Sequence, residues 1–128
     1  MDRILIVDDD KAVLFAFQKL CTAKGVATDT ADTLEGAMEL IAREKYDVVI
    51  SDLNLTGACG RQGFEIVQAA KQRNPLIRSY IWTAYADKIL LDKVAEIGID
   101  GYLIKPVTFT MLLSIITGTT APCLSTST

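Results

Sequence analysis

Short runs composed almost wholly of apolar residues alternate with longer segments in which apolar residues recur every three or four positions. Residues 4–7 are apolar throughout, and residues 47–50 are apolar after the initial Asp47. Strands that are covered on both faces have this composition, so both runs are predicted to be central strands of a parallel sheet. Three more strands are predicted at residues 26–30, 77–82 and 101–104.

Helices are predicted after each of these strands from capping residues and breakers. Asp10 is expected to cap the first helix and Gly25 to end it. Asp32 and Glu35 are expected to form a variant capping box for the second helix. Similar signals delimit the later helices: Gly63 and Asn74 for the third, Asp87 and Gly98 for the fourth, and Thr108 at the start of the fifth.

The apolar positions of four of these helices fall on one face each, which is predicted to point inward. These positions are Val13, Phe17 and Leu20 in the first helix; Leu34, Ala37, Met38 and Ile41 in the second; Phe64, Val67 and Ala70 in the third; and Phe109, Leu112, Leu113 and Ile116 in the last.

Five strands that alternate with five helices predict an α/β fold, in which a parallel sheet joined by right-handed crossovers carries helices on both faces. The residues beyond Gly118 are small, polar and without period. We therefore expect a single domain over residues 1–117, with residues 118–128 as a tail or the start of a linker.

The charge pattern argues against direct binding to nucleic acid, because the formal net charge is −3 and the basic residues are scattered. The apolar runs are too short to span a membrane, and the N-terminal residues lack the pattern of a signal peptide. A cytoplasmic location is expected.

Three cysteines without a C-x-x-C spacing predict reduced thiols rather than a disulfide framework or a zinc site. The chain has no histidine, which excludes mechanisms based on a histidine nucleophile, base or metal ligand. Carboxylate chemistry remains.

Polar residues of complementary chemistry follow the predicted strands, where the ligands of open parallel sheets bind. They are Asp8, Asp9 and Asp10 after the first strand, Asp52 after the third, Thr83 after the fourth and Lys105 after the fifth. Clustered carboxylates suit Mg²⁺, and a central aspartate could attack phosphorus to form an aspartyl-phosphate. Lysine and threonine side chains would stabilise the phosphoryl oxygens.

The segments "ILIVDDD", "VVISDLNL", "IWTAY" and "GYLIKPV" closely resemble the receiver domain of two-component response regulators, over about residues 1–117. The resemblance implies a flavodoxin-like domain with the strand order 2-1-3-4-5. It also implies a signalling domain that catalyses only its own phosphorylation and dephosphorylation, and is otherwise not an enzyme.

The resemblance assigns a role to each strand end. Asp52 matches the phosphoacceptor, which takes its phosphoryl group from a sensor histidine kinase or a histidine phosphotransfer protein. Asp9 matches the direct Mg²⁺ ligand, Asp8 matches the ligand that acts largely through water, and the backbone carbonyl of Asn54 matches the third protein ligand.

Further matches concern the response to phosphorylation. Thr83 and Lys105 match the residues that contact the phosphoryl oxygens, and Tyr102 matches an aromatic switch that follows the threonine. This pair would change the surface around the fourth helix, fifth strand and fifth helix. The Lys105–Pro106 bond matches a cis peptide bond of the family. Tyr85, two residues past Thr83, is expected to flank the route of the attacking water.

One segment departs from the family pattern. Thr56 stands where receiver domains usually carry proline, and Gly63 comes three residues later than expected. We expect an inserted loop of about three residues before the third helix. Because Asn54 precedes this segment, the metal site should be retained.

A phosphatase is the alternative, because "VVISDLNLTG" also resembles the first motif of haloacid-dehalogenase-type phosphatases, with Asp52 as the nucleophile. Three features oppose it: Asn54 cannot protonate a leaving group, the motif lies on the third strand, and the chain is short for that fold. The sequence leaves three outputs open: the domain could act alone, control an attached output domain or form a phosphorylation-dependent homodimer.

Overall fold

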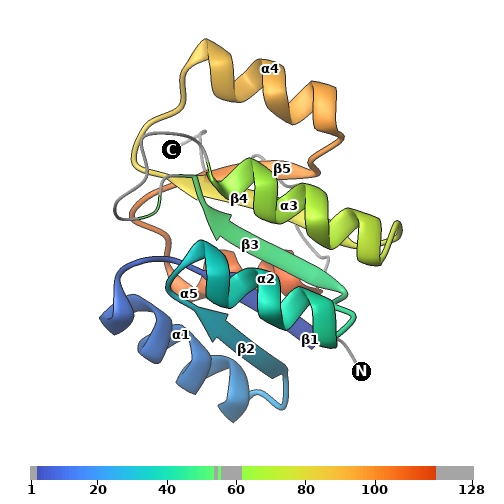
Figure 1. Ribbon diagram of the computed structural model, residues 1–128. Helices are drawn as coiled ribbons and strands as arrows, with labels where there is room; N and C mark the ends of the chain where they lie inside the picture. Colours follow the sequence, from blue (N-terminus) through green and yellow to red (C-terminus); the bar gives the residue numbers. More distant parts are fainter. Residues whose placement is uncertain (1–2, 54, 56–61, 118–128) are drawn as a thin grey trace.

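The computed structural model describes residues 3–53, 55 and 62–117 of the chain (Figure 1). Within these residues, one parallel sheet has the strand order β2-β1-β3-β4-β5, which confirms the predicted fold. Its strands are β1 (Arg3–Val7), β2 (Ala27–Ala31), β3 (Val48–Asp52), β4 (Arg78–Thr83) and β5 (Gly101–Ile104). Its helices are α1 (Lys11–Ala23), α2 (Leu34–Arg43), α3 (Gln62–Arg73), α4 (Lys88–Ile97) and α5 (Phe109–Thr117).

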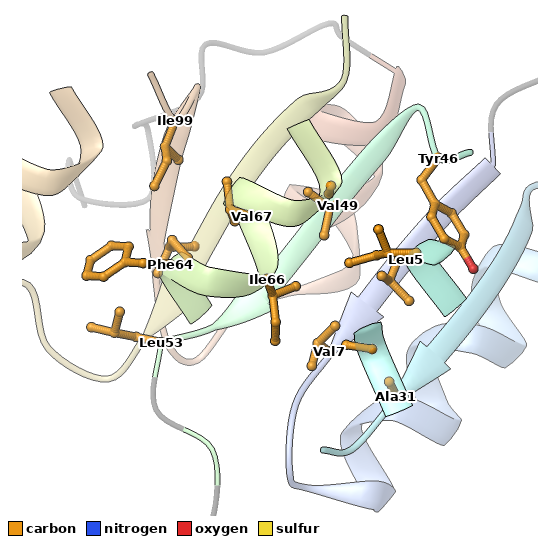
Figure 2. Close-up of a cluster of buried hydrophobic side chains, with 14 of the residues drawn as sticks. Leu5, Val7, Ala31, Tyr46, Val49, Leu53, Phe64, Ile66, Val67 and Ile99 are labelled. Carbon is orange, nitrogen blue, oxygen red and sulfur yellow. The ribbon is translucent and has the colours of Figure 1, made fainter. Parts of the chain in front are cut away.

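Two hydrophobic clusters cover the two faces of the sheet, because successive residues of a strand point to opposite sides. On β1, Ile4 and Ile6 join the cluster under α1 and α5, whereas Leu5 and Val7 join the cluster under α2 and α3. Figure 2 shows the second cluster, in which Ile66 and Val67 of α3 pack over the sheet. The central strands are therefore buried on both faces, as their composition predicts.

Two strands of the sheet end in polar residues. The strands β3 and β4 extend to Asp52 and Thr83, two residues and one residue beyond the predicted ends. Both polar residues are therefore held by the ladder of the sheet: Asp52 is in register with Trp82, and Thr83 with Ile104. Side chains on strand ends are fixed more firmly than side chains on loops.

The predicted capping box of α2 is wrong. The N-cap is Thr33 rather than Asp32, and its Oγ1 accepts a hydrogen bond from the Gly36 amide at 3.0 Å. Thr33 has extended backbone geometry directly before the first helical residue, as an N-cap requires. Asp32 instead forms an ion pair with Lys11 at 3.5 Å.

The other predicted caps are present in the structure. Asp10 and Asp87 cap α1 and α4, and Thr108 Oγ1 accepts a hydrogen bond from the Met111 amide. Gly25 and Gly98 follow α1 and α4 with φ of 79° and 83°, in the left-handed region that favours glycine.

Two inner faces differ from the prediction. In α1, Leu20 is 43% exposed and Leu14 and Cys21 are buried. Leu20 lies about 120° around the helix from Leu14, since each residue turns it by about 100°. In α5, the turn of about 100° per residue likewise moves Leu113 off the buried face. Leu113 is therefore only half-buried, whereas Ile115 is buried. No helix in the described part of the chain has the length and hydropathy that crossing a membrane requires.

Candidate functional site

Three carboxylates meet at the carboxyl edge of the sheet. Asp8 follows β1, Asp9 is next to it, and Asp52 ends β3, and one carboxylate oxygen from each lies within 4.8 Å of the others. Asp8 is 0% exposed and Asp52 is 7% exposed, whereas Asp9 is exposed to solvent. The structure thus brings together the acidic residues that the strand ends predict.

Lys105 supplies a cation to this cluster. Its Nζ lies 2.8 Å from Asp8 Oδ2 and 3.3 Å from Asp52 Oδ2. Burial alone would lower the pKa of Lys105, but the adjacent Asp8 and Asp52 carboxylates outweigh burial and raise this pKa above its ordinary value. The side chain therefore stays protonated throughout the physiological pH range.

The backbone holds these groups in place. The Asp10 amide donates a hydrogen bond to Asp8 Oδ1 at 2.9 Å, and the Asp8 amide donates one to the carbonyl of Ala31 at 3.2 Å. The Lys105 amide donates to the carbonyl of Thr83 at 2.8 Å. Asp8 and Lys105 are thus tied to neighbouring strands by backbone hydrogen bonds, which fix where their side chains begin.

The donor chemistry of the cluster suits a hard divalent cation. The cluster contains three carboxylates and one ammonium group, which contacts Asp8 and Asp52, so it retains net negative charge when all three carboxylates are ionised. The buried Asp8 Oδ2 has the Lys105 ammonium as its close partner, at 2.8 Å. Oxygen-only ligands of this kind fit Mg²⁺.

Thr83 and Tyr102 lie on one face of the sheet. Thr83 is buried at the end of β4, and its Oγ1 accepts a hydrogen bond from the amide of Tyr85 at 3.4 Å. Tyr102 is in register with Ile81, so its half-buried ring packs on the same face as Ile81, against the cluster under α2 and α3. Tyr85 is 73% exposed.

Two features border the site. The Lys105–Pro106 peptide bond is cis, the isomer that the resemblance implies. Asn54 and residues 56–61, where Thr56 and the predicted insertion fall, lie outside the described residues. On its far side, the Gly63 amide donates a hydrogen bond to the carbonyl of Leu53 at 2.9 Å, which joins the start of α3 to the end of β3.

Comparison with known proteins gives a consistent result. The family model described as the response regulator receiver domain matches residues 4–117. A response regulator receiver domain protein (CheY-like) from Methanospirillum hungatei superposes with a TM-score of 0.83 at 27% identity, with 92% of each chain covered.

Two curated proteins show the same similarity. Sporulation initiation phosphotransferase F from Bacillus subtilis is 28% identical over 105 residues, which are 82% of each chain. A cyclic di-GMP phosphodiesterase from Thermotoga maritima is 33% identical over 109 residues, which are 85% of this chain. This chain spans only 28% of that protein's length.

The family match decides between the two interpretations of the motif around Asp52. It includes all five helices and, apart from Arg3, all five strands rather than one segment, so the resemblance to haloacid-dehalogenase-type phosphatases has no support. The chain belongs to the family of response regulator receiver domains of two-component signalling.

Proposed function

We propose that Asp52 is the phosphoacceptor of this receiver domain. The observation that carries the proposal is the position of Asp52, at the end of a buried strand with Asp8 and Asp9 on one side and Lys105 at 3.3 Å. An ionised carboxylate needs no base to become a nucleophile, which suits a chain without histidine.

In the proposed reaction, a carboxylate oxygen of Asp52 attacks the phosphorus of a donor phosphohistidine. The new P–O bond forms as the P–N bond breaks, and the leaving imidazole nitrogen takes up a proton from solvent water. The Lys105 ammonium and the Thr83 hydroxyl stabilise the phosphoryl oxygens during transfer. Because the pKa of Lys105 is raised, its positive charge is available at every physiological pH.

Mg²⁺ is the proposed cofactor. The carboxylates of Asp8, Asp9 and Asp52 would hold it, together with the backbone carbonyl of Asn54, which the resemblance implies. When bound, the ion neutralises charge on the carboxylates and on the incoming phosphoryl group. The cluster of three carboxylates around one lysine supports this assignment.

Phosphorylation is proposed to reach the surface through Thr83 and Tyr102. Both lie on the sheet face nearest α4, and their strands are adjacent. Movement of the Thr83 hydroxyl toward a phosphoryl group would leave space for the Tyr102 ring, which would change the surface around α4, β5 and α5. Tyr85 is proposed to shield the acyl phosphate from water.

The donor is proposed to be a sensor histidine kinase or a histidine phosphotransfer protein in the cytoplasm. Residues 1–117 would form the receiver domain, and residues 118–128 a tail or the start of a linker. The output would be an attached domain, a separate protein target or a homodimer, since the matched part is 28% of one relative's length and 82% of another's.

Trp82 offers a direct test of Mg²⁺ binding, because it is the single tryptophan of the chain and its ring lies 5.7 Å from Lys105 Nζ. Titration with Mg²⁺ should change its fluorescence saturably, since the ion competes with Lys105 for the carboxylates. Asp9→Asn should weaken binding by at least about tenfold. As a control, Asp92→Asn on the surface of α4 should bind Mg²⁺ as the wild type does. Equal affinity of the wild type and Asp9→Asn would refute the metal site.

The same signal tests Asp52 as the acceptor. Beryllofluoride, which binds a carboxylate oxygen in place of a phosphoryl group, should produce a second fluorescence change in the Mg²⁺-loaded wild type. Asp52→Asn should show no second change. A response to beryllofluoride that persists in Asp52→Asn would place the acceptor elsewhere.

A further inference from the structure

Trp82 lies beside the site, at the carboxyl edge of the sheet. It is the next-to-last residue of β4 and is 1% exposed. In the sheet it is in register with Asp52 of β3 on one side and Leu103 of β5 on the other. Its ring packs against Phe17 of α1, with 5.6 Å between the ring centroids.

Trp82 contacts three of the strand ends that form the site. Its indole Nε1 donates a hydrogen bond to the carbonyl of Val7, the residue before Asp8, at 3.2 Å. Its carbonyl accepts a hydrogen bond from the amide of Leu53, the residue after Asp52, at 3.2 Å. Its ring lies 5.7 Å from Lys105 Nζ, within the range of a cation–π interaction.

The surroundings of Lys105 leave room for its flexible side chain to turn away. A cavity of about 390 Å³ adjoins it, lined by Asp10, Val13, Phe17, Trp82, Lys105, Pro106 and Val107. Asp10, whose Oδ1 accepts the capping hydrogen bonds of α1, brings a further carboxylate to the lining of this cavity. The Trp82 ring forms one wall, and its hydrogen bond to Val7 fixes the orientation of that wall.

We propose that Trp82 is a positioning residue for phosphoryl transfer. Its ring keeps the Lys105 ammonium beside Asp8 and Asp52 instead of in the cavity beside Asp10. This inference rests on the proposed role of Asp52 and adds a residue to it. Trp82 acts through Lys105. Removing the Trp82 ring should therefore have the effects of a partial loss of the Lys105 ammonium group.

This role predicts effects of opposite sign on two measurements. Without the ring, Lys105 leaves the carboxylates more often, so Mg²⁺ meets less competition and its Kd should fall about threefold in Trp82→Leu. Phosphorylation by acetyl phosphate at saturating Mg²⁺ should slow about tenfold, because the cation is no longer in place for the phosphoryl oxygens. A packing defect alone would not tighten Mg²⁺ binding.

The matched control is Tyr80→Leu. Tyr80 lies on the same strand and in the same hydrophobic cluster as Trp82, two residues farther from the site, and is 4% exposed. Tyr80→Leu should leave both the Mg²⁺ Kd and the phosphorylation rate within about twofold of the wild type. Trp82→Phe retains a ring but loses the hydrogen bond to Val7, so both of its values should lie between wild type and Trp82→Leu.

Calorimetric Mg²⁺ titration and phosphorylation rates test the inference, at a temperature where circular dichroism shows each variant folded. In a Lys105→Met background, Trp82→Leu should cause no further change. Unchanged values in Trp82→Leu, values equal to those of Tyr80→Leu, or full additivity with Lys105→Met would overturn it.

Two further outcomes are decisive. If Trp82→Leu does not fold, Trp82→Phe carries the test, and a phosphorylation rate equal to that of the wild type overturns the inference. If the wild type takes up no phosphoryl group, the proposed function fails. The Mg²⁺ affinities then decide the role of Trp82 by themselves: tighter binding in Trp82→Leu supports it, and equal binding overturns it.

Discussion

Replacing Gly63 with alanine should destabilise the protein by roughly 3 kcal/mol, because the new methyl group meets backbone atoms. A Cβ at this position would lie 2.4 Å from the carbonyl oxygen of Asp52 and 2.9 Å from the Cα of Leu53. Neither atom belongs to a flexible side chain, so α3 or the end of β3 must shift. Because Asp52 is part of the contact, phosphorylation should also slow.

The control for Gly63 is Gly25→Ala. Gly25 has φ of 79°, and a Cβ added there would meet nothing within 4 Å, so alanine carries only the cost of a left-handed backbone, about 1 kcal/mol. Urea unfolding of both variants at equal m-value measures the difference. A loss of stability in Gly63→Ala no larger than that in Gly25→Ala would contradict the close approach of α3 to Asp52.

Replacing Lys105 with methionine should cost roughly 2–3 kcal/mol of unfolding free energy in the presence of EDTA. Asp8 and Asp52 would then lie side by side with the charge of Lys105 removed. Removing one partner of a fully buried ion pair costs about 3–5 kcal/mol, and the smaller figure reflects the 31% exposure of the Lys105 side chain.

Mg²⁺ should restore much of the stability of Lys105→Met, because the ion supplies the missing positive charge to the same carboxylates. The surface variant Lys88→Met is the control: Lys88 pairs with Asp92 one turn away and is 86% exposed, so its loss should cost less than about 0.5 kcal/mol. A Lys105→Met protein as stable as Lys88→Met in EDTA would show that Lys105 does not neutralise the cluster.

The pH dependence of this difference follows from the raised pKa of Lys105. A group whose pKa is higher in the folded state stabilises that state below its unfolded pKa of about 10.4. The wild type should therefore exceed Lys105→Met in unfolding free energy by a constant amount near neutral pH. This difference should be lost as the pH rises through the pKa that Lys105 has in the folded state.

The sheet and the site edge were predictable because their signals are local. Runs such as residues 4–7 are apolar at every position, and a parallel sheet brings the ends of such strands to one edge. The sequence therefore suffices to place Asp8, Asp52, Thr83 and Lys105 at that edge, and the structure does place Lys105 against Asp8 and Asp52.

Details that depend on tertiary contacts were not predictable. Asp32 and Thr33 are both good N-caps, and only the extended backbone of Thr33 selects between them. The hydrogen bond from Trp82 to Val7 joins residues 75 positions apart, which no local pattern reveals. No local pattern likewise reveals that Lys105 Nζ lies closer to Asp8 Oδ2, at 2.8 Å, than to Asp52 Oδ2, at 3.3 Å.

Gly63 illustrates both cases. The sequence shows a glycine displaced from its usual position relative to Asp52, which indicates an insertion but gives no reason for the glycine. The structure supplies the reason, because the Gly63 Cα packs against the Asp52 carbonyl and a side chain has no room there.

The most direct test of the central claim is the intact mass of the protein after incubation with acetyl phosphate and Mg²⁺. The wild type should gain the mass of one phosphoryl group, EDTA should prevent the gain, and Asp52→Asn should show no gain. Asp92→Asn, which removes an exposed carboxylate on α4, should be phosphorylated as the wild type is. A full gain of one phosphoryl group in Asp52→Asn would contradict the assignment of Asp52 as the phosphoacceptor.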